Sequence, residues 1–508
     1  MLTGLAAALV LVSTTAMGSQ MATQQARPAQ QEQQASAPSA SQQALPQQLL
    51  SLFETGDPAR LRAFVASSFA PPTGEAEPVE TLLTRLDSLA AQSGGVAVSL
   101  WEPQGRRIFF EGVTRKGAIP VEGMAVVADG KILHFEMHRN LQVRGPDAPA
   151  WPPAATNAAQ AIPLIEAEID WRARAERFSG AVLIAHRGQP VIDRAWGLAS
   201  RSPDRPNSVG TLFGTASTTK MLTSAVIGRL IDQGKLTLDT TVARAVPFMA
   251  RAPGAADVTL RDLLGHRVSY GEYFGQTETH PLIASHERAT ELLTLLENRA
   301  PERAPDGQIA YSNANYLVLA AAIEAATGRS FYDVVRDEVL RPSAMLRTNY
   351  GGSGVRPEDV ATGWVKDEVT DPLAIGPWRT NEGRNGGRRG GPAGGALATA
   401  REMWQLVDGI AAGRLIRPQT LQAMLADRRR VGPTIASALG FMSRGGDQVK
   451  FFGHMGGGGN AGVSTSAFVT PDREWAVVVL SNFSSPAGEM LAGQIMDYLQ
   501  KLPPTPAE

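Results

Sequence analysis

The chain has 508 residues, 43% of them hydrophobic, and this length favours more than one domain. Its 48 basic and 49 acidic residues leave a net charge of -1, so no overall field attracts it to nucleic acid or to an anionic membrane surface. The absence of cysteine excludes disulfides, thiolate metal sites and a cysteine nucleophile. Only seven of the basic residues are lysine, so motifs that require lysine seldom arise by chance.

The N-terminal stretches carry targeting and linker signals. Residues 2–17 form an apolar run followed by small residues, which is typical of a secretory signal although a basic start is missing. We therefore expect a signal-like segment at 1–19 and export to the periplasm or the medium. Residues 20–45, rich in Gln, Ala, Ser and Pro, predict a disordered leader. No later stretch is long and apolar enough to span a bilayer, so we expect no stable membrane span in the mature protein.

Residues 46–144 predict a small α+β domain. Two helical patterns come first, and Asp57 followed by Pro58 is typical of the start of the first helix. Four alternating stretches separated by glycine-containing turns then predict strands. The Pro- and Ala-rich segment 145–161 predicts a linker.

Residues 162–503 predict a larger α+β domain. It opens with the hairpin pattern "GAVLIAH", "RGQP", "VIDRAWGLA" and closes with the strand patterns "GVSTSAFVT" and "REWAVVVLSN" and an amphipathic stretch. Helical patterns lie between them. We therefore expect one antiparallel sheet flanked by helices, with strands from both ends of the domain, together with an all-helical subdomain. The active site of such a fold would lie between the sheet and the helices.

The stretch "GTASTTKMLT" (214–223) places Ser217 three residues before Lys220 at a predicted helix start. A serine hydroxyl needs a base at hydrogen-bond distance to act as a nucleophile, and positions i and i+3 share one face of a helix. The helix N-terminus also offers free N–H groups that can stabilise an oxyanion. The alternative is two polar residues on a solvated turn, because this spacing arises by chance about twice in a chain of this length.

Two further motifs follow in order along the chain. "YSN" places Tyr311 and Asn313 at a second helix start, and "HMG" places His454 and Gly456 just before a predicted strand. Ser-x-x-Lys and Tyr-x-Asn each occur once, whereas a second His-x-Gly lies in the hairpin turn. The ordered set of three motifs favours a catalytic site over chance. A histidine that is merely packed remains the alternative for His454.

With this ordered set the chain resembles the serine β-lactamase-related hydrolases, which comprise class C β-lactamases, D-alanyl-D-alanine carboxypeptidases, D-aminopeptidases and related esterases. The likeness covers about 170–500 and includes "LFGTASTTKMLTSAVIGRLIDQGKLTLDTTV", "YSNANYLVLAAAIEAATGRSFYDVV", "AGGALATAREM" and "FFGHMGGGG". Matching of this extent is far more specific than any single tripeptide.

The resemblance implies a role for each motif residue. Ser217 would be acylated, Lys220 and Tyr311 would relay its proton, and Asn313 would hold a substrate amide or Lys220 itself. A lysine with an ordinary pKa of ~10.4 must have that pKa lowered by roughly 3 to 4 to be neutral at pH 7. Because two such groups in contact titrate as a pair, either Lys220 or Tyr311 could be the base. No cofactor and no metal is implied.

The third motif departs from the class C pattern. The resemblance implies that His454 and Gly456 line the substrate site, and that the N–H groups of Ser217 and Gly457 form the oxyanion hole. Class C β-lactamases carry Lys-Thr-Gly here, so a fixed cation is replaced by a histidine that we expect to be partly protonated at neutral pH. This departure argues against β-lactams and favours peptides or esters as substrates.

Other features leave alternatives open. His266 is interpreted as structural, and the contribution that the atypical loop after it makes to the pocket is left open. "GRNGGRRGGPAGG" (383–395) is either a mobile solvated loop or a cationic rim in which Arg384, Arg388 and Arg389 attract acidic substrates. A metal hydrolase or an α/β-hydrolase is disfavoured, because His-Glu-x-x-His and Gly-x-Ser-x-Gly are both absent from the sequence. A non-enzymatic binding or sensor protein on the same scaffold is the remaining rival.

These observations predict an exported serine hydrolase that acts through an acyl-enzyme on a small-molecule or peptide substrate. Small peptides or D-amino-acid compounds lead as substrates, esters follow, and β-lactams come last. No nucleic-acid partner is expected, and the oligomeric state is left open.

Overall fold

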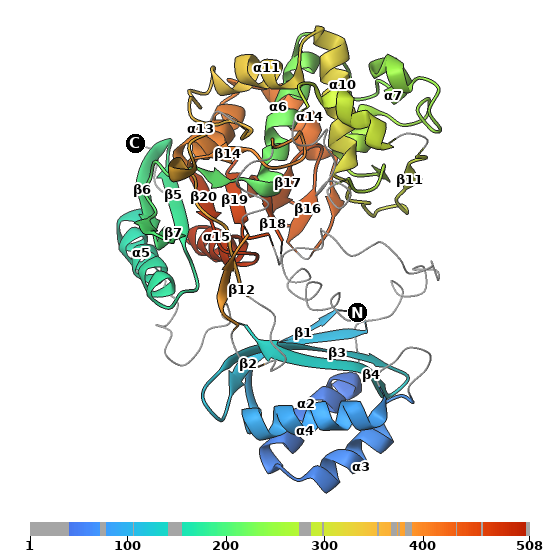
Figure 1. The fold of residues 1–508 in the computed structure, drawn as a ribbon, viewed down its shortest axis with the longest axis vertical. Coiled ribbons are helices and arrows are strands. Elements are labelled where there is room, and N and C mark those ends of the chain that lie inside the picture. Colours follow the sequence, from blue (N-terminus) through green and yellow to red (C-terminus); the bar gives the residue numbers. More distant parts are fainter. Residues whose placement is uncertain are drawn as a thin grey trace. The chain divides into compact units, whose positions relative to one another are not determined.

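A computed structural model of the chain describes residues 40–71, 78–104, 106–140, 155–273, 286–296, 299–352, 355–366, 373, 376–381, 389–432, 434–458 and 461–503. These residues form two compact units (Figure 1). The smaller unit takes residues 40–140 together with the segment 366–378, and the larger unit takes residues 155–365 and 379–503. The domain limits given by the sequence analysis remain predictions. They place residues 366–378 in the domain 162–503, whereas the structure groups this segment with the smaller unit.

The smaller unit packs helices against a four-stranded antiparallel sheet of order β1-β2-β3-β4 (Figure 1). Its elements are α2 (Ala40–Thr55), α3 (Pro58–Ser68), α4 (Val79–Ser93), β1 (Val96–Gln104), β2 (Arg107–Thr114), β3 (Pro120–Ala128) and β4 (Lys131–Arg139). As predicted, the Asp57 side chain caps α3, accepting hydrogen bonds from the N–H groups of Ala59 and Arg60. Leu373 of the segment 366–378 is 3% exposed within this core.

Two helices begin inside segments that the sequence analysis assigns to a leader and a linker. Helix α2 begins at Ala40, within the predicted leader 20–45. Helix α5 (Ala158–Arg174) begins within the predicted linker 145–161, and the Asn157 side chain caps it by accepting from the Gln160 N–H. The signal-like segment 1–19 lies outside the described residues, so export remains a prediction. In the part of the chain that the structure describes, no helix combines the length and the apolar character needed to cross a membrane.

The larger unit is built on an eight-stranded antiparallel sheet that joins strands from both ends of the domain. In spatial order its strands are β15 (Arg429–Arg430), β16 (Ile435–Ser437), β17 (Met442–Arg444), β18 (Phe451–Gly457), β19 (Ser464–Val469), β20 (Trp475–Ser481), β5 (Gly180–His186) and β6 (Gln189–Trp196). Two-stranded pairs are formed by β7 (Leu198–Arg201) with β8 (Asp204–Pro206), β9 (Phe213–Gly214) with β14 (Leu397–Ala398), β10 (Val268–Ser269) with β11 (Glu302–Arg303), and β12 (Trp364–Lys366) with β13 (Trp378–Thr380). The predicted fold class is confirmed. The motif "HMG" lies within β18 itself and not before a strand as predicted.

Helices cover both faces of this sheet. Their bounds are α6 (Lys220–Asp232), α7 (Val242–Ala245), α8 (Leu260–Leu264), α10 (Ala314–Thr327), α11 (Phe331–Val335), α13 (Ala400–Ala411), α14 (Pro418–Ala426) and α15 (Ala487–Leu499), with shorter turns η2 (Ala216–Thr219), η3 (Pro247–Met249), η5 (Ala289–Leu296), η6 (Arg336–Leu340) and η7 (Pro357–Asp359). Ala476, Val478 and Leu480 of β20 belong to a core that contains side chains of α6, α10 and α13. Helix α15 also contacts β19 and β20, but its side chains do not belong to that core. Since successive side chains of a strand point to opposite faces of the sheet, α15 covers the other face.

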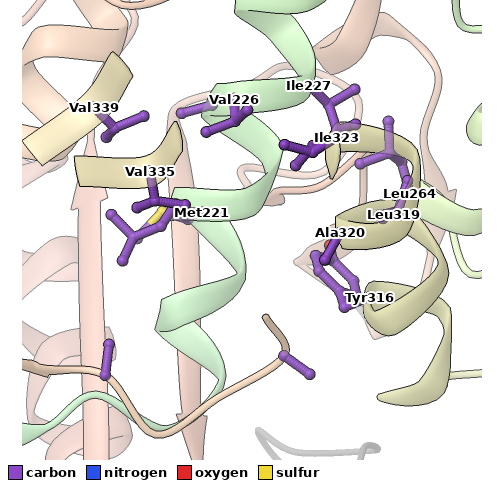
Figure 2. Packing of buried hydrophobic residues seen from close by; sticks show 14 of the residues in the cluster. Met221, Val226, Ile227, Leu264, Tyr316, Leu319, Ala320, Ile323, Val335 and Val339 are labelled. Carbon is purple, nitrogen blue, oxygen red and sulfur yellow. The ribbon is translucent and has the colours of Figure 1, made fainter. Parts of the chain in front are cut away.

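Helix α6 is the centre of the helical region. Ten of its residues are buried, and Figure 2 shows it between α10 on one side and the segment that carries Val335 and Val339 on the other. A helix that is buried on nearly all sides is held by the elements that surround it. The beginning of α6, where Lys220 lies, is therefore held in place by the core.

Candidate active site

Ser217 lies at the junction between the sheet and the helical region. It is in the short 3-10 helix η2, which leads directly into α6. The residue before it, Ala216, has a φ of 42°, a left-handed conformation that is costly for a residue other than glycine. The preceding carbonyl, that of Thr215, accepts a hydrogen bond of 3.1 Å from the Thr465 hydroxyl on β19. The surrounding structure thus holds Ser217 on a strained turn against the sheet.

The hydroxyl of Ser217 is contacted by two side chains predicted from the motifs. Lys220 Nζ lies 3.2 Å from Ser217 Oγ, and Tyr311 Oη donates a hydrogen bond of 2.8 Å to the same oxygen. Lys220 Nζ also donates to Asn313 Oδ1 at 2.6 Å and to the carbonyl oxygen of Ala393 at 2.7 Å. The structure therefore brings together Ser217, Lys220, Tyr311 and Asn313, which are widely separated along the chain.

Burial shifts the acid–base properties of both proton-bearing groups. Lys220 is 0% exposed, and desolvation lowers its pKa to about 7, against a smaller upward effect of the Glu272 carboxylate. Burial raises the pKa of Tyr311 well above its ordinary value, so this phenol stays protonated at neutral pH. A substantial share of Lys220 is therefore neutral near pH 7, whereas Tyr311 is available there as a proton donor.

The residues around Tyr311 fix its ring. The "YSN" motif ends in Asn313, the cap residue of α10, as the sequence predicts. His266 accepts a hydrogen bond from the Ser312 N–H through Nδ1 at 3.2 Å, and its ring packs 4.4 Å from the Tyr311 ring. Burial, together with nearby Lys220, keeps the pKa of His266 well below its ordinary value, so the ring is neutral. These contacts favour the structural role expected for His266.

The strand β18 approaches Ser217 at Gly456. A Cβ atom at Gly456 would lie 2.4 Å from Ser217 N, so only glycine allows this approach. Among the described strands, β17 pairs with β18 only at residues 451–453, so none of them pairs with the β17-facing edge of 454–457. Gly457 follows Gly456 on β18, which contacts η2, and the oxyanion hole formed with Ser217 stays a prediction.

His454 is neutral, which corrects the expectation of partial protonation. Its side chain is 4% exposed, and burial together with the nearby Lys220 lowers its pKa to about 3. Since a carbonyl oxygen can only accept, Nδ1 carries the ring proton and donates to the carbonyl of Met455 at 2.6 Å. His454 therefore supplies no positive charge at neutral pH.

Sequence reasoning missed two contributors to the site. The Glu272 carboxylate accepts a hydrogen bond from Asn313 Nδ2, although Glu272 lies in the atypical loop whose role the sequence left open. The carbonyl of Ala393, which binds Lys220, is a backbone atom with no signature in the sequence. Within the described ranges, no group of three or more His, Asp or Glu side chains is arranged to bind a metal ion.

The glycine- and arginine-rich segment is held in place at its described end. Arg389 stacks 3.8 Å above the Tyr332 ring and donates to the carbonyl of His286 at 2.8 Å. These contacts argue against a mobile loop at Arg389, whereas the cationic rim stays a prediction. Arg384 and Arg388 lie outside the described residues.

A buried carboxyl group supports β18 from the other side. A Cβ atom at Gly457 would lie 2.7 Å from Glu489 Oε1, and the hydroxyls of Ser464 and Ser485 donate to the carboxyl oxygens of Glu489. Glu489 is 2% exposed, and burial raises its pKa to about 8. This group is thus largely uncharged at neutral pH.

Glu489→Gln is expected to remove part of the pH dependence of stability. Because the folded pKa of about 8 lies above the ordinary value of 4.5, the folded state binds more protons between them, and the wild type loses stability as pH rises through this window. We compare the free energy of unfolding in urea at pH 5 and at pH 9. Between these two pH values the wild type should lose about 2 to 4 kcal/mol more of this free energy than the variant does. Glu302→Gln, at an exposed position, is the control, and parallel curves for the wild type and Glu489→Gln would contradict the prediction.

The sheet is covered by helices, and a serine, a lysine and a tyrosine are in hydrogen-bond contact at a helix start. This arrangement is typical of the serine hydrolases that use a Ser-x-x-Lys motif. A family model described as beta-lactamase matches residues 165–500, and the chain belongs to this family.

Known proteins that resemble the chain carry several activities in their names. Esterase EstB of Burkholderia gladioli is 31% identical over 202 residues, which are 37% of this chain and 51% of the esterase. The penicillin-binding protein from Bacillus halodurans is 25% identical with a TM-score of 0.54, covering 67% of this chain and 98% of that structure. The D-amino acid amidase from Ochrobactrum anthropi SV3 is 19% identical with a TM-score of 0.54, covering 68% and 97%, and shows the fold alone. The matched regions span between 34% and 51% of the curated relatives.

Proposed function

We propose that this protein is a serine hydrolase that cleaves amide or ester bonds through an acyl-enzyme on Ser217. The observation that carries the proposal is the convergence of Lys220 Nζ and Tyr311 Oη on Ser217 Oγ. A solvated turn would leave these groups exposed, whereas Lys220 is completely buried. A buried lysine at hydrogen-bond distance from a serine is the arrangement that nucleophile activation requires.

Lys220 is the base in this proposal. A neutral amine has two N–H groups and one lone pair. The carbonyl oxygens of Asn313 and Ala393 can accept the two N–H groups, so the lone pair is left to face Ser217 Oγ. Tyr311, which stays protonated, donates to the same oxygen in the resting site.

The reaction then follows from these positions. Lys220 takes the proton of Ser217 Oγ as this oxygen attacks the substrate carbonyl, and the N–H groups of Ser217 and Gly457 stabilise the oxyanion. Tyr311 gives its proton to the leaving amine or alcohol, and it recovers a proton from Lys220. Water then attacks the acyl-enzyme, the same groups remove its proton, and Ser217 Oγ is released with a proton restored.

Small peptides or D-amino-acid compounds are the substrates that we propose first. At neutral pH the uncharged His454 offers no fixed cation to hold the carboxylate that β-lactams carry, so these substrates come last. The same neutral site also suits simple esters, and the likeness to an esterase supports a carboxylesterase as the second candidate. We propose export as well, on the apolar run at residues 2–17.

Covalent labelling tests the proposal. A fluorophosphonate or penicillin probe should add to the native protein at one residue, and peptide mass spectrometry should place the adduct on Ser217. A panel of D-Ala-D-Ala peptides, aminoacyl p-nitroanilides, p-nitrophenyl esters and nitrocefin then ranks the substrates. Native protein that takes no label and turns over no member of the panel would instead favour a binding or sensor protein on this scaffold.

A further inference from the structure

We propose that Glu272 is a positioning residue of this site, which fixes the side-chain amide of Asn313 so that its oxygen faces Lys220 and places a negative charge near that lysine. The inference rests on the proposed function, because it concerns how Lys220 is prepared as the base. Glu272 belongs to none of the three motifs, and it lies in the loop that follows β10.

The first step concerns the orientation of Asn313. An asparagine amide can be turned by 180°, which exchanges its oxygen with its NH2 group. A carboxylate only accepts hydrogen bonds, so the group that faces Glu272 must be Nδ2, and Oδ1 is left for Lys220. In the opposite orientation two N–H groups would face the N–H groups of Lys220. The carboxylate thus selects the orientation in which Lys220 has an acceptor.

The second step concerns how the Glu272 carboxylate is held, since its residue is exposed. Its Oε1 accepts from the backbone N–H of Tyr273 at 2.8 Å, and Ser312 Oγ, from the "YSN" motif, donates to the carbonyl of Gly271 at 2.8 Å. Gly271 has a φ of 87°, where side chains are strained, and a Cβ atom there would also lie 2.5 Å from Arg299. The loop backbone is therefore fastened to the motif that contains Asn313.

The third step concerns charge. Among the described residues, the titratable groups that contact Lys220 or act on it electrostatically are Glu272, Tyr311, Tyr316, His266 and His454. Burial keeps both tyrosines protonated and both histidines neutral at neutral pH. Glu272 is therefore the one anion in this set, and it raises the pKa of Lys220 against the larger lowering by burial. Removing the charge should make Lys220 lose its proton at lower pH.

Two substitutions separate orientation from charge. Glu272→Gln keeps an oxygen that can accept from Asn313 but removes the charge, whereas Glu272→Ala removes both. The rate of Ser217 labelling by a fluorophosphonate is measured against pH for each variant. We expect the rising limb of Glu272→Gln to move to lower pH by roughly 0.3 to 1 pH unit, since an exposed charge acts weakly, with its plateau retained within about threefold. We expect Glu272→Ala to show the same shift and a plateau about 10- to 100-fold lower.

A direct titration keeps this test independent of activity. With seven lysines in the chain, NMR of protein labelled at the lysine side chains can follow each titration, and a Lys220→Met variant identifies the signal of Lys220. Glu302→Gln, at an exposed position on β11, is the matched control and should leave both the rate profile and the Lys220 signal unchanged. An unchanged Lys220 titration in Glu272→Gln together with an unchanged plateau in Glu272→Ala would overturn the inference. If the wild-type protein takes no label, the proposed function fails, but the Lys220 titration still tests the inference about charge. If Glu272→Ala does not fold, the Lys220 titration of Glu272→Gln tests the inference alone.

Discussion

Ser217→Ala should lower kcat/KM by about 10⁴-fold or more on every substrate that the native protein hydrolyses. The hydroxyl is the atom on which Lys220 and Tyr311 converge, so its removal leaves the base and the acid without a nucleophile. The variant should also take no fluorophosphonate label. Because the side chain is small and lies at a half-buried position, the fold should persist, which circular dichroism and the thermal midpoint can show.

Ser208→Ala is the matched control for this substitution. Ser208 lies in the same unit, is exposed, and bonds only locally in the structure, to Thr211. Its replacement should leave kcat/KM and labelling within about twofold of the native values, as for most exposed positions. Activity of Ser217→Ala that equals the native activity on the whole panel would contradict the acyl-enzyme mechanism.

Local sequence patterns predicted much of the fold. The start of α3 at Asp57 and Pro58 depends on capping within a few residues, and at the start of α10 the Ser312 hydroxyl accepts a hydrogen bond from the Asn315 N–H, which is also local. Helix α2 escaped prediction because its Gln- and Ala-rich beginning has the composition of a disordered leader. Its stability depends instead on burial of Leu49 and Phe53 in the core, which is a tertiary effect.

The candidate site divides in a similar way between local and long-range information. The motifs predict Ser217, Lys220, Tyr311 and Asn313, because residue types at a fixed spacing can be recognised in a sequence. The contribution of Glu272 depends on a contact between a loop and a helix start, and no spacing rule relates the two. Similarly, the neutrality of His454 follows from its burial in β18, which the motif alone cannot reveal.

Gly456→Ala is expected to have the second largest effect on activity. The φ of Gly456 lies outside the left-handed region, so alanine can adopt the same backbone conformation there. The added Cβ atom, however, would lie 2.4 Å from Ser217 N and 2.8 Å from Ser217 Cβ. Relieving this overlap would displace the turn that carries the nucleophile, because both atoms belong to that turn. Separating η2 from β18 would misplace Ser217 relative to the N–H of Gly457. A displacement of about 1 Å lowers rates by about 10²-fold, so we expect labelling of Ser217 to slow by at least that factor.

The stability of Gly456→Ala distinguishes a displaced nucleophile from an unfolded protein. Crowding of one methyl group should cost about 1 to 3 kcal/mol, which a domain of this size can tolerate. Gly458→Ala is the matched control, because its Cβ atom would meet the Ala461 Cβ at 3.3 Å, a contact that a small shift relieves. Labelling of Gly458→Ala should therefore stay within a fewfold of the native rate. Native labelling rates in Gly456→Ala would show that the contact between β18 and Ser217 is looser than the structure has it, and that the oxyanion hole does not depend on this glycine.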